Sequence, residues 1–352
     1  MNTACRRVLT VLFLLTPLVV VAQPSLYVTP DVPTDLDATT YLPWEIVRGD
    51  VGSHASELLL PEGTPVDALH RMDGGDWLFS VAVPTTLDGA TYQPADIVRF
   101  DGTTYSTHFS GSAAGVPPGS GVDALFLNDT GDLVISFDVP TTIGAVTYEP
   151  ADLVLVSGGA FFLYLDASSG SMPLPPTSNL IGADFRDEAA IATFDVPTTI
   201  GSDTYLPGEL FAWDGDTVEP YAVDPSWPTS SRVNALSFLP PAGEAASILL
   251  SKAGPGALTI SWSPSCLAGA EGYAIYQGQI GNWYSHVPIG CFDDEDDLTE
   301  TFPMPGGGHY YLVVPYNDND EGSHGVDSAG QPRPRVAEVC VATQVTATCP
   351  VE

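Results

Sequence analysis

The stretch from Asp138 to Val154, DVPTTIGAVTYEPADLV, decides the fold because the chain contains it four times. The other copies read DVPTDLDATTYLPWEIV (31–47), AVPTTLDGATYQPADIV (82–98) and DVPTTIGSDTYLPGELF (195–211). The Val-Pro-Thr phrases begin at Val32, Val83, Val139 and Val196, and their prolines are 51, 56 and 57 residues apart. A period of this size predicts a repeat architecture, in which each copy is one supersecondary unit that packs on its neighbours.

The third copy shows what one unit contains. Short runs of β-forming residues occupy 123–127, 132–139, 152–156 and 161–165, and turn-forming residues separate them. Four short strands in roughly 56 residues are typical of one blade of a β-propeller. No stretch of useful length has helical periodicity, so we expect an all-β protein.

The ends of the repeat region favour a closed ring. The first copy has no first strand, and an unpaired segment, Asn234 to Leu239 (NALSFL), follows the fourth copy and matches Asp123 to Leu127 (DALFL). If this segment pairs beside 26–32, it completes a blade and leaves no exposed sheet edge. We therefore predict a four-bladed propeller over 23–241, with a β-solenoid or a twofold sandwich as the alternatives.

The long loop between the second and third strands carries an aromatic and an acidic residue in every copy. We refer to these eight residues as the rim set: Tyr41, Glu45, Tyr92, Asp96, Tyr148, Asp152, Tyr205 and Glu209. Gathered on one face, they could bind sugar rings or a cation. The alternative is structural: the tyrosines pack against the next blade, and the acids cap a turn.

The start of the chain and its charge bear on location and partners. Residues 1–22 resemble a secretory signal peptide, with Arg6 and Arg7 before an apolar run that is short for a membrane anchor. Without them the net charge changes from −34 to −36, which disfavours binding to nucleic acid or to anionic lipid. The 44% of hydrophobic residues argue against disorder. We expect a secreted or cell-surface protein with no membrane insertion after cleavage.

The C-terminal part resembles a fibronectin type III domain over 245–330. The resemblance rests on Leu258 to Ser263 (LTISWS) as strand B, Gly272 to Tyr276 (GYAIY) as strand C and Tyr310 to Asn317 (YYLVVPYN) as strand F. It implies a β-sandwich with Trp262 buried, and Tyr310 at the corner position. Tyr310, Leu312, Val314 and Tyr316 would then point inward. The family implies a spacer or adhesive module without catalysis.

Four cysteines follow the signal peptide, all in the last quarter of the chain: Cys266, Cys291, Cys340 and Cys349. An even number in an exported protein predicts two disulfides. We expect the short-range pairs Cys266–Cys291 and Cys340–Cys349, the second closing a tail over 331–352. A zinc site is the alternative, but the spacing of the cysteines does not support it.

One acidic loop, Asn317 to Gly322 (NDNDEG), has oxygen-bearing side chains at alternate positions and glycine sixth, as a calcium loop has. Asn317, Asn319 and Glu321 are therefore weak calcium candidates. The twelfth position holds Ser328 instead of the glutamate that completes such a loop. No other cofactor is indicated.

The sequence contains no recognisable catalytic set. It lacks a nucleophile elbow, a phosphate-binding glycine loop and histidine pairs at metal-binding spacing. We therefore expect a binding or structural protein that contacts an extracellular glycan, cation or protein through the propeller face. The alternative is a polysaccharide hydrolase or lyase built on the same scaffold, because the many carboxylates leave acid–base pairs open.

Overall fold

The computed structural model describes residues 25–50, 53–72, 75–128, 130–171, 173–186, 189–221, 227–228, 231–239, 242–267, 269–292, 297–326, 332–336 and 338–345. The predicted signal peptide (1–22) and Cys349 lie outside these residues. No helix in the described ranges is both long and apolar enough to cross a membrane.

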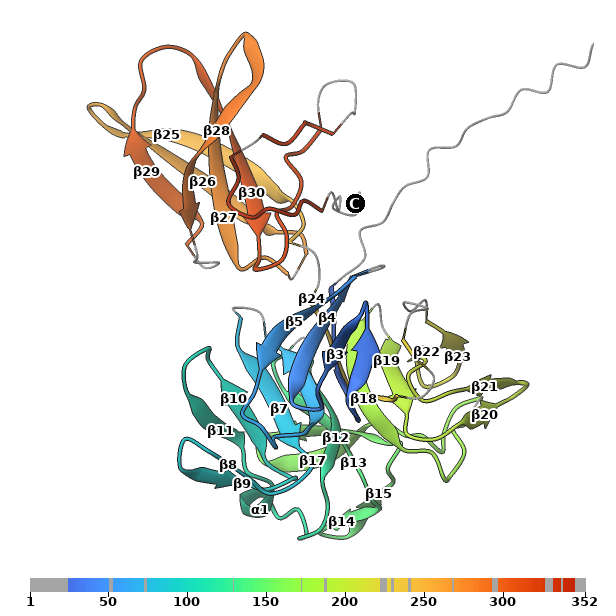
Figure 1. Ribbon diagram of the computed structural model, residues 1–352. Coiled ribbons are helices and arrows are strands. Elements are labelled where there is room, and N and C mark those ends of the chain that lie inside the picture. The colour runs from blue at the N-terminus through green and yellow to red at the C-terminus, as the bar shows by residue number, and fades with distance from the viewer. Residues whose placement is uncertain are drawn as a thin grey trace, which may run out of the picture.

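Four antiparallel sheets of four strands form the blades of the propeller (Figure 1). Blade 1 consists of β24 (Val233–Leu239), β1 (Ser25–Pro30), β4 (Glu45–Asp50) and β5 (Ser53–Leu59). Blade 2 consists of β6 (Val66–Arg71), β7 (Trp77–Val81), β10 (Ile97–Phe100) and β11 (Tyr105–Phe109). Blade 3 consists of β12 (Val122–Leu127), β13 (Leu133–Phe137), β16 (Leu153–Ser157) and β17 (Ala160–Leu165). Blade 4 consists of β18 (Leu180–Arg186), β19 (Ala189–Phe194), β22 (Phe211–Trp213) and β23 (Val218–Pro220).

The predicted ring closure is confirmed. Strand β24 pairs antiparallel with β1 over its whole length, with Leu236 opposite Val28. The last strand of the repeat region thus supplies the inner strand of the first blade. Because β24 pairs with β1, the inner edge of blade 1 is covered, and neither end of the repeat region leaves an unpaired inner strand.

The inner strands β6, β12, β18 and β24 surround a common axis. Each contacts both neighbours, and the diagonal pairs β6–β18 and β12–β24 also touch. Apolar side chains fill the seams between blades, as where Phe126 of blade 3 meets Phe194 and Trp213 of blade 4 in one buried cluster. Burial of such seams is what ties each blade to the next.

The long loops fold into small hairpins, which the sequence analysis did not predict. They are β2–β3 (Thr34–Leu36, Thr39–Tyr41), β8–β9 (Thr85–Leu87, Ala90–Tyr92), β14–β15 (Thr141–Ile143, Val146–Tyr148) and β20–β21 (Thr198–Ile200, Asp203–Tyr205). In the second hairpin both turn residues, Asp88 and Gly89, have positive φ (47° and 82°), as a tight two-residue hairpin turn requires. A short helix, α1 (Gly111–Ala114), follows β11.

The C-terminal part is a β-sandwich, as predicted. One sheet holds β25 (Ala245–Gly254), β26 (Ala257–Ser265) and β29 (Thr299–Pro303), and the other holds β28 (Asn282–Phe292), β27 (Gly272–Gln279) and β30 (His309–Tyr316). Between them lies a core that includes Ile260, Trp262, Tyr273 and Val313. Trp262 is buried, as expected. Membership of the fibronectin type III family stays a prediction.

The inward alternation predicted for β30 is wrong. Val313, not its neighbours, faces the core between the sheets. Leu312, Val314 and Tyr316 lie in a separate cluster, which Val336 and Val341 of the C-terminal segment pack against. The C-terminal segment therefore covers the outer face of this sheet, so that both faces of β30 are buried and sequence alternation alone could not assign them.

Both predicted disulfide pairs are wrong, because Cys291 of β28 bonds to Cys340 of the C-terminal segment. Their Cα atoms are 5.9 Å apart. Cys266 is also disulfide-bonded. Short sequence separation was a poor guide here, since the segment returns across the outer face of the sheet and brings Cys340 beside Cys291.

We expect peptide mapping under non-reducing conditions to link Cys291 to Cys340. The bond joins residues that are 49 positions apart in the sequence. Replacing both cysteines by alanine increases the conformational entropy of the unfolded chain, which should lower the free energy of unfolding of the sandwich by about 2–4 kcal/mol. Denaturant unfolding of the variant beside the oxidised protein measures this. Recovery of a peptide joining Cys266 to Cys291 would contradict the assignment.

Candidate functional site

The two ends of the propeller differ in what covers them. The sandwich lies at the end where β24, β4 and β5 are seen, and the hairpins β8–β9 and β14–β15 lie at the opposite end (Figure 1). We call the hairpin end the free face. Because a scaffold of this kind binds ligands through the loops at an open end, a ligand site is expected on the free face.

The four tyrosines of the rim set are buried on this face. Tyr41, Tyr92, Tyr148 and Tyr205 are only 2–4% exposed. The hydroxyl of Tyr41 donates to the carbonyl of His54, 3.0 Å away, and Tyr148 packs against Phe137 and Phe161. These contacts hold the hairpins of blades 1 and 3 against their own blades, and not against the next blade as the structural alternative had it.

The four acids of the rim set cap the turn before the third strand. Asp96 and Asp152 each accept a hydrogen bond, 2.8 Å long, from the backbone N–H three residues earlier. Glu45 and Glu209 do the same at 3.2 and 2.8 Å. The same bond in every blade explains why the acid repeats. Asp152 also lines a cavity of about 370 Å³. A ligand-binding role for the rim set stays a prediction.

The loop proposed for calcium docks the sandwich onto the propeller. Asn319 hydrogen-bonds to Tyr27 and Arg48 of blade 1. Beside it, Asp318 forms an ion pair with Arg71 of blade 2, with 2.5 Å between Oδ2 and Nη2. Arg71 is buried and Asp318 is exposed, and a charged hydrogen bond between them fixes orientation.

The other two calcium candidates also make hydrogen bonds within the sandwich, although Oε2 of Glu321 accepts none. Asn317 Oδ1 accepts the N–H groups of Asn319 and Asp320, at 3.0 and 2.9 Å, and Glu321 accepts the hydroxyl of Tyr276. Within the part of the chain that the structure describes, no three His, Cys, Asp or Glu side chains are grouped so as to hold a metal ion. We therefore do not propose calcium at this loop.

The free face has a polar ring at the propeller axis, where each inner strand begins. We call Asp67, Asp123, Asn179 and Asn234 the axial ring; they are 56, 56 and 55 residues apart. The amide of Asn234 donates to Asp67 (3.0 Å), and that of Asn179 donates to Asp123 (2.8 Å). The carboxyl groups of Asp67 and Asp123 are neighbours, and each influences the pKa of the other. Oδ1 of Asn179 is buried and accepts no hydrogen bond.

The two carboxyl groups of the axial ring share a proton. Burial raises the pKa of Asp123 to about 9, and the adjacent charge of Asp67 adds to this effect, while the Asn179 amide opposes it. Burial likewise raises the pKa of Asp67. Two carboxyl groups this close cannot both ionise without a compensating positive charge. At neutral pH the ring therefore holds a proton where a cation could sit.

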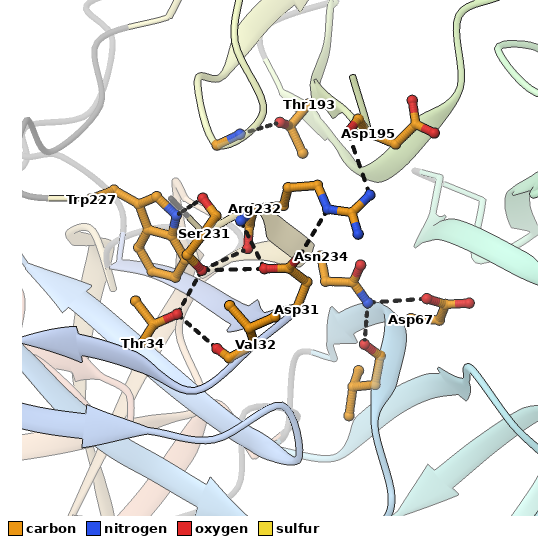
Figure 2. A network of polar contacts seen from close by, with 12 residues as sticks. Asp31, Val32, Thr34, Asp67, Thr193, Asp195, Trp227, Ser231, Arg232 and Asn234 are labelled. Atoms are coloured by element: carbon orange, nitrogen blue, oxygen red, sulfur yellow. Dashed lines mark hydrogen bonds and ion pairs between the residues drawn. The ribbon is translucent and has the colours of Figure 1, made fainter. Parts of the chain in front are cut away.

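Further carboxylates surround the ring at the position before three of the four Val-Pro-Thr phrases: Asp31, Asp138 and Asp195. Arg232 pairs with Asp31 (Nε to Oδ2, 2.9 Å) and reaches the carbonyl of Asp195 at 3.4 Å (Figure 2). Asp138 accepts the N–H of Gly121 at 2.6 Å, and its charge raises the pKa of Asp123. Oδ1 of Asp195 is buried without a hydrogen-bond partner. Arg232 is thus a single guanidinium among five carboxyl groups.

A cavity of about 530 Å³ opens beside the ring, between blades 2 and 3. Asp67 and Asp138 line it. So does Ala82, which stands where the other three copies have aspartate. The shorter side chain at this one position leaves Asp67 accessible from the cavity, and it breaks the fourfold repetition at the face where a ligand would enter.

The axial ring is not evident from the sequence, although three of its four residues share a local pattern. Asp67, Asp123 and Asn234 each precede Ala-Leu in the segments aligned as first strands. In the sequence these polar residues stand at the start of apolar runs, and nothing there marks them as one group. Asn179 precedes Leu-Ile-Gly, so the fourth member could be recognised only once the strands were in place.

No protein-family model matches the chain, and no curated protein sequence matches it. Comparison with solved structures finds an inactive virginiamycin B lyase from Staphylococcus aureus with quinupristin: 11% identity, 84% of this chain and 90% of that chain, TM-score 0.29. YCF48 bound to D1 peptide shares 9% identity over 64% of this chain and 57% of that chain, TM-score 0.28. PorZ, a surface component of the type-IX secretion system of Porphyromonas gingivalis, shares 9% over 83% and 49%, TM-score 0.28.

Proposed function

We propose that this is an exported binding protein whose free propeller face recognises a positively charged group at the axial ring. The observation that supports this most is the pair of neighbouring acids at the ring, Asp123 buried and Asp67 lining the cavity, with the pKa of both raised. Two neighbouring carboxyl groups are stabilised by a positive charge beside them, and a bound cation would replace the proton in that role. The ligand would be the amine of a larger ligand; calcium is the comparison cation, since no three His, Cys, Asp or Glu side chains among the described residues are grouped to hold a metal ion.

The other groups around the axis fit the same ligand. Asn179 offers a buried carbonyl oxygen that accepts no hydrogen bond, and carboxylate and amide oxygens are the donors that calcium prefers. They are equally the acceptors that an ammonium group needs. The cavity lined by Asp67 and Asp138 provides a route in for either.

Isothermal titration calorimetry tests the proposal, with calcium chloride and putrescine as separate titrants at pH 7 and pH 8.5. Because the pKa of Asp123 is about 9, binding must displace its proton, and affinity should rise with pH by up to about tenfold per unit below 9. Two buffers of different ionisation enthalpy should give different heats, which reports the released proton. Binding of calcium or of putrescine shows whether the axial ring accepts a metal ion or an ammonium group.

The variant Asp123→Asn should lower the affinity at least tenfold and abolish proton release, since its amide cannot ionise. Glu62→Gln, which neutralises an exposed acid outside the axial ring, is the matched control and should leave both unchanged. Absence of binding by both titrants at pH 8.5 would overturn the proposal. Binding that Asp123→Asn leaves intact would do the same.

Two further observations support export and the role of the sandwich. The disulfide between Cys291 and Cys340 suits an oxidising compartment outside the cytosol. The ion pair between Arg71 and Asp318 holds the sandwich against the end of the propeller opposite the axial ring. We infer that the sandwich is a fibronectin-like spacer, which presents the free face outward.

A further inference from the structure

The outer strand of the sandwich carries an exposed aromatic group. We call Ile280, Trp283 and Tyr284, at the tip of the β27–β28 hairpin, the hairpin platform. Their exposed fractions are 60%, 61% and 46%. Large apolar side chains clustered at such exposure on one short turn are unusual for a soluble surface and mark a contact site.

The backbone of the hairpin is built to present these rings. Gln277 pairs with Val287 and Gln279 with Asn282, so that four residues of β28 lie opposite a single residue, Gly278. Tyr284 within this bulge has a φ of +66°. Bulges re-aim side chains, and strained positions of this kind concentrate at functional sites.

The platform is supported from below. The ring of Trp283 packs against that of Tyr310, with 5.4 Å between centroids. Tyr310 lies directly on Gly278, where an added Cβ would stand 2.2 Å from its Cζ, and its hydroxyl is 3.2 Å from Nδ1 of the buried His286. Tyr310 is held in place by these contacts, and the indole of Trp283 rests on it. Covering the indole with a ligand therefore costs little side-chain conformational entropy.

The sheet under the platform carries no charged residue. In a chain with 54 Asp, Glu, Lys and Arg residues, strands β27, β28 and β30 contain none. Around the exposed rings the side chains are amides and hydroxyls, including Gln279, Asn282 and Ser285. A surface of flat aromatic rings bordered by neutral hydrogen-bonding groups matches a ligand with C–H faces and many hydroxyls, and offers nothing to an ionic one.

We propose that the hairpin platform binds a neutral polysaccharide, with a sugar ring stacked on Trp283 and hydroxyls bonded to the neighbouring amides. This site is separate from the axial ring and does not depend on it.

Native affinity electrophoresis of the full chain tests the proposal, because a protein of this charge migrates fast and retardation is easily measured. The gels would contain β-glucan, xylan or galactomannan as neutral polymers, and polygalacturonate as the anionic one. We expect retardation by at least one neutral polymer. Trp283→Ala should reduce the association constant at least tenfold, and Trp283→Phe should restore part of it.

Two control variants distinguish binding at the hairpin platform from nonspecific hydrophobic adsorption and from binding at the axial ring. Leu249→Ala removes another exposed apolar side chain, on the opposite sheet, and should leave retardation unchanged, as should Asp123→Asn. Thermal melting confirms that each variant is folded. Retardation by none of the neutral polymers, by polygalacturonate alone, or equally in Trp283→Ala would overturn the proposal.

Discussion

Replacing Asp123 by asparagine should make the protein more stable while removing its cation binding. In the folded protein the pKa of Asp123 is raised to about 9, whereas an unfolded aspartate titrates near its ordinary value of 3.8. The folded state therefore holds a proton that the unfolded state releases. This contribution to stability is fully present below pH 3.8 and is lost progressively as the pH rises towards 9. Asparagine keeps the neutral form at every pH.

The gain should grow with pH, and this dependence is the measurement. Each pH unit between the two pKa values contributes at most about 1.4 kcal/mol, and sharing of the proton with Asp67 reduces it, so we expect about 2 kcal/mol at pH 8. Urea unfolding of variant and wild type at pH 5, 7 and 8 tests this. Geometry permits the exchange, because an asparagine amide can donate to Asp67 while its carbonyl accepts from Asn179.

Glu62→Gln again serves as the control, and its stability should follow that of the wild type at all three pH values. If Asp123→Asn is destabilised, or if its advantage does not widen with pH, then the carboxyl pair does not share a proton as described. If Asp123 lowers the stability of the ligand-free protein, then its carboxyl group is not kept for stability. Such a cost is expected of a residue that is retained for binding.

The sequence predicted the ring better than it predicted the site, for a physical reason. A closed array needs the same turn caps and buried tyrosines in every copy, so Asp96 and Asp152 recur and stand out when the copies are aligned. Function needs members that differ from copy to copy, such as Ala82 in place of aspartate. When the copies are aligned, such a difference cannot be distinguished from chance variation. Its meaning becomes visible only when the structure places the four inner strands around one axis.

The sandwich shows a second limit. Burial on both sides of β30 removes the alternation that distinguishes inside from outside, and the covering segment that carries Cys340 lies far along the chain. The pairing of Cys291 depends on the path of that segment. No local pattern in the sequence records this path, whereas the pairing of β24 with β1 followed from a missing strand at one end and a spare one at the other.

Introducing a charge into the closing strand should unfold the propeller. Leu236 of β24 is fully buried and packs with Val28 of blade 1 and Ile191 of blade 4, so that it belongs to the seam where the ring closes. Leu236→Asp buries an unpaired carboxylate among apolar side chains, which should cost about 4 kcal/mol or more. We expect loss of the cooperative unfolding transition of the propeller. Leu249→Asp, at a residue 64% exposed, should leave it unchanged.

A milder pair of variants distinguishes ring closure from ordinary core packing. Leu125 occupies the position of Leu236 in blade 3 and is equally buried, but blade 3 consists of consecutive chain, whereas β24 joins a blade from the far end of the repeat region. Both alanine variants should lose about 2–4 kcal/mol. Only Leu236→Ala should let β1 and β4 exchange their amide hydrogens faster than the rest of the propeller, because the seam between blades 4 and 1 opens first. If amide hydrogens exchange at the same rate in all blades of both variants, then β24 contributes no more to the stability of the ring than any other inner strand.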